Sequence, residues 1–183
     1  MGKIYIIDVT NRDGVQTAKL GLSKLEKTMI NIYLNDMGVF HSEFGFPTTK
    51  HEKFYLEANE ELADLGVLKP IHLGGWIRAT AADVEMAFRL VPKLKHLNLS
   101  ISTSDQMIQG KFQGRKTRDD ILQTMVDAVD VARSYGAKTI GVNAEDASRT
   151  DLDFLVEFAS EAKAHGADRF RYCDTLGYDN PFT

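Results

Sequence analysis

The sequence predicts an α/β fold in which about six parallel strands alternate with about five helices. One observation behind this is a regular alternation between short apolar segments, typical of buried strands, and longer segments whose apolar residues recur every three or four positions. Another is that glycines, which commonly end helices, stand at 38, 66, 136 and 166. Their spacing indicates a repeat of roughly 30 residues, the size of a strand, a crossover helix and their connections.

The expected elements follow one another in strict alternation. The strands are expected at 4–7, 39–47 with its following loop, 71–77, 96–101, 139–143 and 169–174. Each is an apolar run of the length typical of a buried parallel strand. The helices are expected at 23–38, 49–66, 80–92, 117–136 and 150–166.

Capping signals indicate where the helices begin. Ser23, Thr49 and Thr80 are each followed three residues later by an acidic residue that can complete a capping box. An apolar stripe then follows in the first helix, at Leu25, Met29, Ile32, Tyr33 and Met37. Between the fourth strand and its helix, residues 102–116 are expected to form a long polar loop.

Composition indicates a single globular chain of ordinary character. Hydrophobic residues make up 43% and charged residues 26%, and the net charge is -4. This balance gives no global electrostatic reason to bind nucleic acid or an anionic membrane. No apolar run is long enough to span a bilayer, and no signal-peptide pattern precedes the first strand. The only cysteine, Cys173, forms no internal disulfide, which fits a cytoplasmic location.

The placement of polar residues separates two architectures that both fit a parallel sheet, an open doubly wound sheet and a (β/α)8 barrel. No glycine-rich dinucleotide motif follows the first strand, as a Rossmann fold would require. Polar residues instead follow the expected strands at their C-terminal ends, where barrel enzymes carry their sites. They are Arg12, Asp13, Glu43, Arg78, Asn143, Glu145, Asp174 and Thr175. This distribution favours the barrel.

The segment after the first strand has the chemistry of a site for an anion and a metal ion. Asp13 offers a hard oxygen ligand for a divalent cation, and Arg12 offers a fork of donors for a carboxylate or enolate. Gln16, one turn later, adds further hydrogen-bonding groups. The alternative is that Arg12 and Asp13 are an ordinary surface pair, since such pairs are common and weak.

Five motifs together resemble a known family. They are Arg12-Asp13-Gly14-x-Gln16, Glu43-Phe44-Gly45-Phe46-Pro47, Ser104-Asp105 with Lys111, Glu145-Asp146-Ala147-Ser148-Arg149, and Asp174-Thr175-Leu176-Gly177. In this order along the chain they resemble the metal-dependent barrels of homocitrate synthase, isopropylmalate synthase, citramalate synthase and hydroxymethylglutaryl-CoA lyase. Within that family, the run from Glu145 to Arg149 is most similar to homocitrate synthases of the nitrogen-fixation type.

The resemblance implies an acyltransferase that joins acetyl-CoA to a 2-oxo acid, 2-oxoglutarate first among them, by a Claisen condensation in nitrogen fixation or lysine biosynthesis. It implies Arg12 and Glu145 as catalytic residues and Asp13 as a ligand of a divalent cation, Mg, Mn or Zn. It further implies a set of substrate-binding residues: Gln16, Glu43, Arg78, Asn143 and Thr175. Glu145 and Asp146 have an alternative role as caps of the following helix. Lys111, Arg115 and Lys116 either meet the substrate or CoA phosphates, or belong to a solvated loop.

Four departures from the family pattern bear on these expectations. Asn11 stands where the family usually has leucine, and little effect is expected from it. Thr80 stands where some homocitrate synthases have a histidine that contacts substrate, and Asn143 stands where some have a serine; both bear on how the second carboxylate is recognised. The family's His-x-His metal ligands are not matched by any histidine of this chain.

The resemblance therefore predicts an incomplete (β/α)8 barrel. Residues 1–183 are expected to form the N-terminal three quarters of one catalytic barrel with no second domain, and to stop where the next helix should begin. A homodimer or a complementary C-terminal chain is expected as partner. Two alternatives remain open: a non-catalytic subunit or remnant of a split synthase, and a related synthase or lyase.

Overall fold

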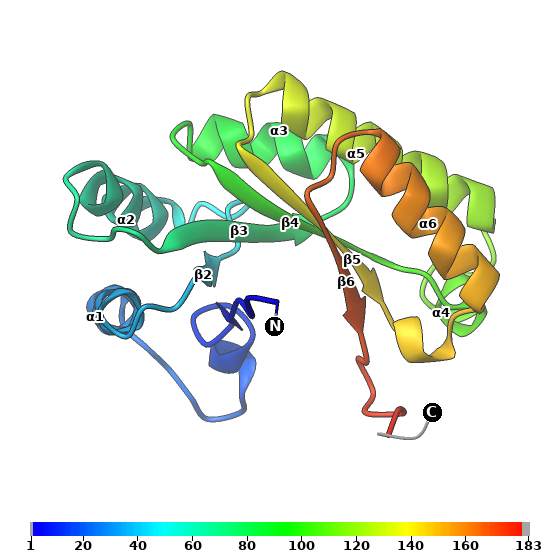
Figure 1. Cartoon of the computed structure of the whole chain (residues 1–183), viewed down its shortest axis with the longest axis horizontal. Coiled ribbons are helices and arrows are strands. Elements are labelled where there is room, and N and C mark those ends of the chain that lie inside the picture. Colours follow the sequence, from blue (N-terminus) through cyan, green and yellow to red (C-terminus); the bar gives the residue numbers. More distant parts are fainter. Residues whose placement is uncertain (1, 181–183) are drawn as a thin grey trace. The chain divides into compact units, whose positions relative to one another are not determined.

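The computed structural model describes residues 2–180; its six strands occur in the predicted order, with one helix more than the five predicted (Figure 1). Six strands follow one another in the sheet in sequence order, β1 to β6. They are β1 Ile7–Asp8, β2 His41–Gly45, β3 His72–Arg78, β4 His96–Ser102, β5 Thr139–Glu145 and β6 Arg169–Cys173. The predicted fold class, an incomplete (β/α)8 barrel, is confirmed. The segment where a further helix was expected to begin lies outside the described residues.

Six α-helices and two short 3-10 turns connect these strands within residues 2–180. The helices are α1 Lys24–Asp36, α2 Lys53–Asp64, α3 Ala81–Leu90, α4 Asp105–Gly110, α5 Arg118–Ser134 and α6 Leu152–Ala164. The 3-10 turns are η1 Gly14–Gln16 and η2 Ala147–Arg149. None of these helices combines the length and apolarity that crossing a membrane requires.

The chain divides into two compact units. The first consists of the residues up to 77 together with 86–97, and the second of 78–85 together with the residues from 98 onward. In the first, β1, β2 and β3 pair in parallel, and the partner of Glu43 on β3 is Gly74, next to an irregularity in the β2–β3 register. In the second, β5 and β6 pair in parallel, and α5 and α6 lie side by side and contact β5 (Figure 1).

Helix α1 turns its polar side inward. Its capping box between Ser23 and Glu26 is present as predicted. The apolar stripe, however, is largely exposed: Leu25, Met29, Tyr33 and Met37 all face away from the interior, and Ile32 is half-buried. The buried residues of α1 are Lys27, Asn31 and Leu34. An apolar stripe usually marks the core side of a helix, and here that rule fails because the interior beside α1 is polar.

Three details of the predicted elements were wrong: the start of the first strand, the loop at 102–116 and the capping box at Thr49. The first strand begins at Ile7 rather than at 4, and residues 4–6 are exposed. The loop 102–116 contains the short helix α4, which Ser104 caps by accepting a hydrogen bond from the N–H of Met107. The capping box at Thr49 does not form, because the carboxylate of Glu52 accepts instead from the backbone N–H of Phe46, at 2.6 Å.

Candidate functional site

The segment between β1 and α1 folds into a tight turn that presents Arg12 and Asp13. The backbone N–H groups of Arg12, Asp13 and Gly14 donate to the carbonyl oxygen of Val9 at 3.1, 2.8 and 3.1 Å. The 3-10 turn η1 continues from there to Gln16. Three donors on one carbonyl fix the backbone of this segment, residues 9–16, which we call the Arg12 turn.

The side chain of Arg12 is held by an aromatic ring and a carboxylate. Its guanidinium carbon lies 3.5 Å from the ring centroid of Trp76 on β3. Its Nη1 pairs with Oδ1 of Asp13 at 2.6 Å; the Arg12 side chain is 15% exposed and that of Asp13 60%. Phe46 packs against the same indole, with ring centroids 5.7 Å apart. Stacking on a flat ring restricts the guanidinium, so its donors point in defined directions.

A cavity of about 340 Å³ lies beside the Arg12 turn. Polar and aromatic side chains line it together: Asn11, Arg12, Val15, Gln16, Gly45, Phe46, Thr49, His51, Glu52 and Trp76. The predicted site residues Arg12 and Gln16 therefore share one cavity. Gly45 is required at its wall, because a Cβ there would lie 2.5 Å from Oε2 of Glu52.

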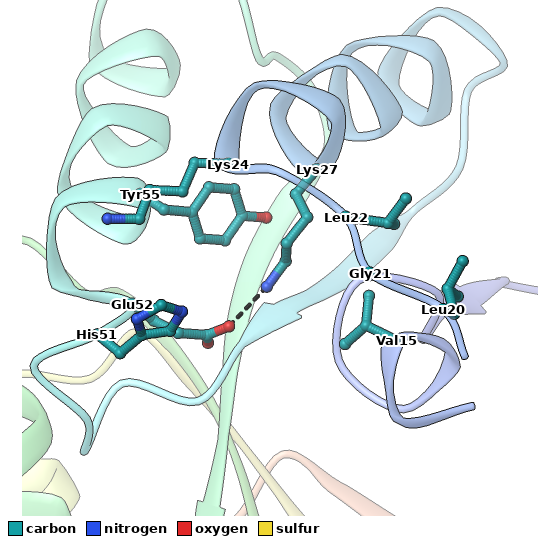
Figure 2. Close-up of a pocket in the computed structure, with 9 residues that line it drawn as sticks. All are labelled: Val15, Leu20, Gly21, Leu22, Lys24, Lys27, His51, Glu52 and Tyr55. Atoms are coloured by element: carbon teal, nitrogen blue, oxygen red, sulfur yellow. Dashed lines mark hydrogen bonds and ion pairs between the residues drawn. The ribbon is translucent and has the colours of Figure 1, made fainter. Parts of the chain in front are cut away.

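A second pocket of about 230 Å³, which also includes His51 and Glu52, contains a buried ion pair (Figure 2). Nζ of Lys27 lies 2.6 Å from Oε1 of Glu52, and 4.4 Å from the ring centroid of Tyr55. Both oxygens of Glu52 are thus engaged, one by Lys27 on α1 and the other by the N–H of Phe46 after β2. Glu52 connects helix α1 to the loop whose phenyl ring supports Trp76.

In the second unit, Glu145 belongs to a compact polar cluster. Its Oε2 accepts from Oγ of Ser102 at 2.6 Å and from Nζ of Lys111 at 2.7 Å, and Lys111 also donates to Ser102 at 2.9 Å. We call Ser102, Lys111 and Glu145 the Glu145 cluster. Lys111 therefore has defined partners, although its side chain is still 45% exposed. Arg115 and Lys116 pair instead with Gln113 and with Oγ1 of Thr124.

Asp146, next along the chain, stands at the N-cap position of η2, but its side chain accepts no capping hydrogen bond there. It is 1% exposed, has a φ of 64° and accepts from Ser104 and Arg149, both at 2.5 Å. Burial raises the pKa of this carboxyl, but the hydrogen bonds from Arg149 and Ser104 outweigh burial and leave the pKa below its usual value. Its backbone N–H donates to Oγ1 of Thr175 at 2.9 Å. The alternative that Glu145 and Asp146 cap the next helix is wrong, since Asp151 caps α6.

Arg78 is exposed and already holds a carboxylate. Its Nε and Nη2 donate to the two oxygens of Asp83 at 2.6 and 2.8 Å. This hydrogen bonding and the charge of Asp83 raise the pKa of Arg78 above its usual value. The pair uses the Nε–Nη2 edge of the guanidinium, so a second carboxylate would have to meet Nη1 or replace Asp83.

Glu43 and Asn143 are buried within their strands, at 1% and 2% exposure. Oδ1 of Asn143 has no hydrogen-bond partner in the described part of the chain. A buried amide oxygen without a partner is uncommon and is consistent with an acceptor reserved for a ligand.

Comparison with known proteins identifies the family. A model of the HMGL-like family matches residues 3–183. The chain belongs to the HMGL-like family. It is 70% identical over 183 residues to citrate (Re)-synthase from Dehalococcoides mccartyi, and 41% identical over 179 residues to 2-isopropylmalate synthase 2 from Caldanaerobacter subterraneus. It is 33% identical over 183 residues to homocitrate synthase 1 from Nostoc.

Among these three relatives, the citrate (Re)-synthase is the most similar in sequence. The homocitrate synthase that the motifs suggested is less similar. The alignments cover 100%, 98% and 100% of this chain but only 44%, 44% and 46% of the relatives. The chain thus spans less than half the length of the curated relatives it matches. The hydroxymethylglutaryl-CoA lyase of Pseudomonas aeruginosa shares the fold, with a TM-score of 0.74, 17% identity, and coverage of 97% of this chain and 60% of the lyase.

Two residues that matter to the geometry of this HMGL-like chain escaped prediction from sequence. Trp76 was assigned only to a strand, although an aromatic residue two positions before Arg78 lies near the C-terminal end of β3. Ser102 was assigned to a loop, although it is the last residue of β4. Both lie where barrel enzymes carry functional residues, and that position was the available signal.

One described residue, Asp13, has the chemistry of a metal ligand. Among residues 2–180, no cluster of three or more His, Cys, Asp or Glu residues has the arrangement of a metal site. Asp13, however, is 60% exposed and pairs with Arg12 through Oδ1 alone. Its second oxygen is a hard donor of the kind that Mg²⁺ and Mn²⁺ prefer, so Asp13 can contribute one ligand.

Proposed function

We propose that this chain is the N-terminal part of a synthase that condenses acetyl-CoA with a 2-oxo dicarboxylic acid. The observation that carries the proposal is the guanidinium of Arg12, which is stacked on Trp76 and paired with Asp13 beside a cavity. The family supports a condensing reaction, since its curated relatives are named as synthases. We further propose a single barrel domain and a cytoplasmic location.

The 70% identity to a citrate (Re)-synthase favours oxaloacetate over 2-oxoglutarate as the acceptor. Citrate contains the carbon skeleton of oxaloacetate joined to an acetyl group, whereas homocitrate contains that of 2-oxoglutarate. The two acids differ by one methylene, which a binding site distinguishes by only about 1–3 kcal/mol. Both are candidates, in the order oxaloacetate, then 2-oxoglutarate.

Arg12 has the role of stabilising the oxyanion that forms when the enolate of acetyl-CoA adds to the ketone. A fixed donor at such a developing charge is worth roughly 3 kcal/mol. Asp13 has the role of metal ligand; a divalent cation, when bound, supplies Lewis-acid polarisation of the ketone. The stack on Trp76 keeps the guanidinium in place before substrate arrives, so no free energy is spent on ordering it during the reaction.

Glu145 has the role of moving a proton in the condensation. A carboxylate that accepts from both Lys111 and Ser102 is oriented on one oxygen, Oε2, which leaves Oε1 to meet a reacting group. Gln16, Glu43, Arg78, Asn143 and Thr175 have the role of substrate binding. Arg78 suits a carboxylate best, because its guanidinium is exposed and has Nη1 to donate beside its pair with Asp83.

The test is an assay of thiol release from acetyl-CoA with four 2-oxo acids: oxaloacetate, 2-oxoglutarate, 2-oxoisovalerate and pyruvate. It is run with this chain alone, and with this chain mixed with the C-terminal part of the Dehalococcoides mccartyi citrate (Re)-synthase. We expect turnover with oxaloacetate in the mixture, by way of a homodimer or complementary-chain assembly. Turnover with none of the four acids would contradict the proposal and favour a non-catalytic subunit.

A further inference from the structure

The inner side of α1 forms a buried polar network that reaches the Arg12 turn. Asn11, the residue before Arg12, is 0% exposed. Its Nδ2 donates to the carbonyl oxygen of Lys27 and to Oδ1 of Asn31, both at 2.8 Å. Both acceptors lie on α1, so the turn is fastened to the helix immediately before the arginine.

Asn31 is the centre of this network and is fully satisfied. Its Oδ1 accepts from Asn11 and from Oγ of Ser42 on β2, the latter at 2.9 Å. Its Nδ2 donates to the hydroxyl of Tyr55 and to Oδ1 of Asn59, at 3.0 and 2.9 Å. An asparagine amide has two donors and two acceptor positions, and all four are used here. Asn31 thus connects the Arg12 turn to β2 and α2.

Stability does not account for the amide at position 11. Oδ1 of Asn11 is buried and has no hydrogen-bond partner in residues 2–180. A buried acceptor without a partner costs about 1–3 kcal/mol, which an apolar residue of similar size avoids. The amide of Asn11 therefore makes directional hydrogen bonds at a cost in folding free energy. Those hydrogen bonds fix the Arg12 turn against α1.

We propose that Asn11 and Asn31 are positioning residues that set the Arg12 turn, and through it the contact between Arg12 and Trp76. This inference rests on the proposed function in one respect, which is the role of Arg12 as the donor to the oxyanion. It replaces the expectation that the departure from leucine at Asn11 has little effect. A leucine has the same branched shape, although its methyl groups are larger than the amide atoms, and it lacks the two donors that fix the turn against α1.

Trp76 provides a direct readout, because it is the only tryptophan of the chain. Its indole N–H gives a single NMR resonance, and the guanidinium of Arg12 stacks on the ring that carries it. The variants are Asn11→Leu and Asn31→Ala, with Arg12→Ala as the reference for a lost stack. Asn35→Ala is the matched control, because Asn35 is also on α1 but bonds with Val67 and Ile71 instead.

We expect Asn11→Leu to fold while its indole resonance moves toward that of Arg12→Ala. Oxaloacetate affinity, measured by the same resonance in the presence of Mg²⁺, falls about tenfold. Asn35→Ala keeps both the resonance and the affinity. If Asn31→Ala does not fold, Asn11→Leu decides, since it removes only one of the contacts of Asn31.

The inference is overturned if Asn11→Leu keeps both the wild-type indole resonance and the wild-type affinity for oxaloacetate. It is also overturned if Asn35→Ala shifts the resonance as far as Asn11→Leu does, because the effect is then general loosening of α1. A wild-type chain that binds none of the 2-oxo acids contradicts the proposed function instead. In that case the indole resonance alone decides whether the two asparagines position Arg12.

Discussion

At the scale of single residues, Arg12 differs from an ordinary surface arginine in what restricts it. The indole of Trp76 fixes the plane of the Arg12 guanidinium, and the ion pair with Asp13 fixes its orientation within that plane. The N–H groups of Arg12 therefore point in defined directions. A lysine cannot reproduce this, because its ammonium is a point charge without a plane or a fork.

We therefore expect Arg12→Lys to lower the turnover number at least about 100-fold, the usual cost of a lost oxyanion donor. The measurement is thiol release from acetyl-CoA with oxaloacetate in the mixture described above. Arg89→Lys, on the exposed side of α3, is the control and is expected to keep wild-type turnover. Equal turnover in Arg12→Lys and Arg89→Lys would exclude Arg12 from the chemistry.

Lys111 and Lys116 come from the same loop region but have different partners. Lys111 donates to Glu145 and Ser102, whereas Lys116 donates to Oγ1 of Thr124. We expect Lys111→Met to lower the turnover number about tenfold or more with little change in KM, because Glu145 loses a charge-assisted bond that orients it. Lys116→Met should leave both constants unchanged. A change confined to KM in Lys111→Met would instead indicate a substrate-binding lysine.

At the scale of elements, helix α2 contains a buried acid that is sensitive to pH. Glu60 is 2% exposed, and its nearest cation is Nζ of Lys95 at 3.9 Å. Burial raises its pKa to about 7, although Lys95 acts in the opposite direction. The folded chain therefore keeps this proton between pH 4.5 and 7 while the unfolded chain loses it, so stability falls as pH rises through that range.

We expect Glu60→Gln to remove that loss. Between pH 4.5 and pH 8, the free energy of unfolding of the variant should rise relative to the wild type by about 2–3 kcal/mol. Urea unfolding at several pH values measures this difference. Glu61→Gln, an exposed neighbour on α2, is the control and should follow the wild type at every pH. A constant difference between Glu60→Gln and the wild type would contradict the assignment.

The 3-10 turn η2 depends on Asp146 in two ways. The carboxylate satisfies Ser104 and Arg149, and the backbone is left-handed, a conformation that asparagine tolerates far better than alanine does. We expect Asp146→Asn to lower the free energy of unfolding by about 2 kcal/mol, and Asp146→Ala by about 1 kcal/mol more. Asp151→Asn is the control, since asparagine caps α6 as well as aspartate does. The same cost for both Asp146 variants would show that backbone strain plays no part.

Elements were predictable where local signals and packing agree. The capping box at Ser23 formed as its spacing indicates, and another, which was not predicted, joins Thr117 to Asp120. Helix α1 shows where local signals fail. Its apolar stripe has the correct period, yet the interior it borders is polar, so Lys27 and Asn31 face inward. The periodicity of apolar residues predicts which residues lie on the same side of a helix. It does not predict which side of the helix packs against the rest of the chain.

The candidate site was predictable to a similar extent. Position at the C-terminal end of a strand made Arg12, Asp13 and Glu145 candidates, and their roles stay predictions. The contacts that hold them were not predictable, since Trp76 is 64 residues from Arg12 and Lys111 is 34 residues from Glu145 in sequence. Glu52 shows the same limit, because its spacing from Thr49 suggested a capping box while the fold placed its carboxylate between Lys27 and Phe46.

At the scale of the whole molecule, the last strand of the described sheet has a neighbour on one side only. Within residues 2–180, β6 pairs with β5, and no other described strand lies beyond it. Phe170 and Tyr172 on β6 are 40% and 47% exposed. An unpaired strand edge with exposed aromatic residues promotes association between chains, and a lysine on such an edge opposes it.

We therefore expect this chain on its own to associate as its concentration rises, and Tyr172→Lys to weaken that association about tenfold. Sedimentation velocity over a range of concentrations measures it. Val156→Lys adds the same charge at an exposed apolar position on α6 and is expected to associate like the wild type. Adding the C-terminal part of the Dehalococcoides mccartyi citrate (Re)-synthase should also suppress self-association, because its strands compete for the same edge. If both lysine variants weaken association equally, net charge and not the β6 edge is responsible.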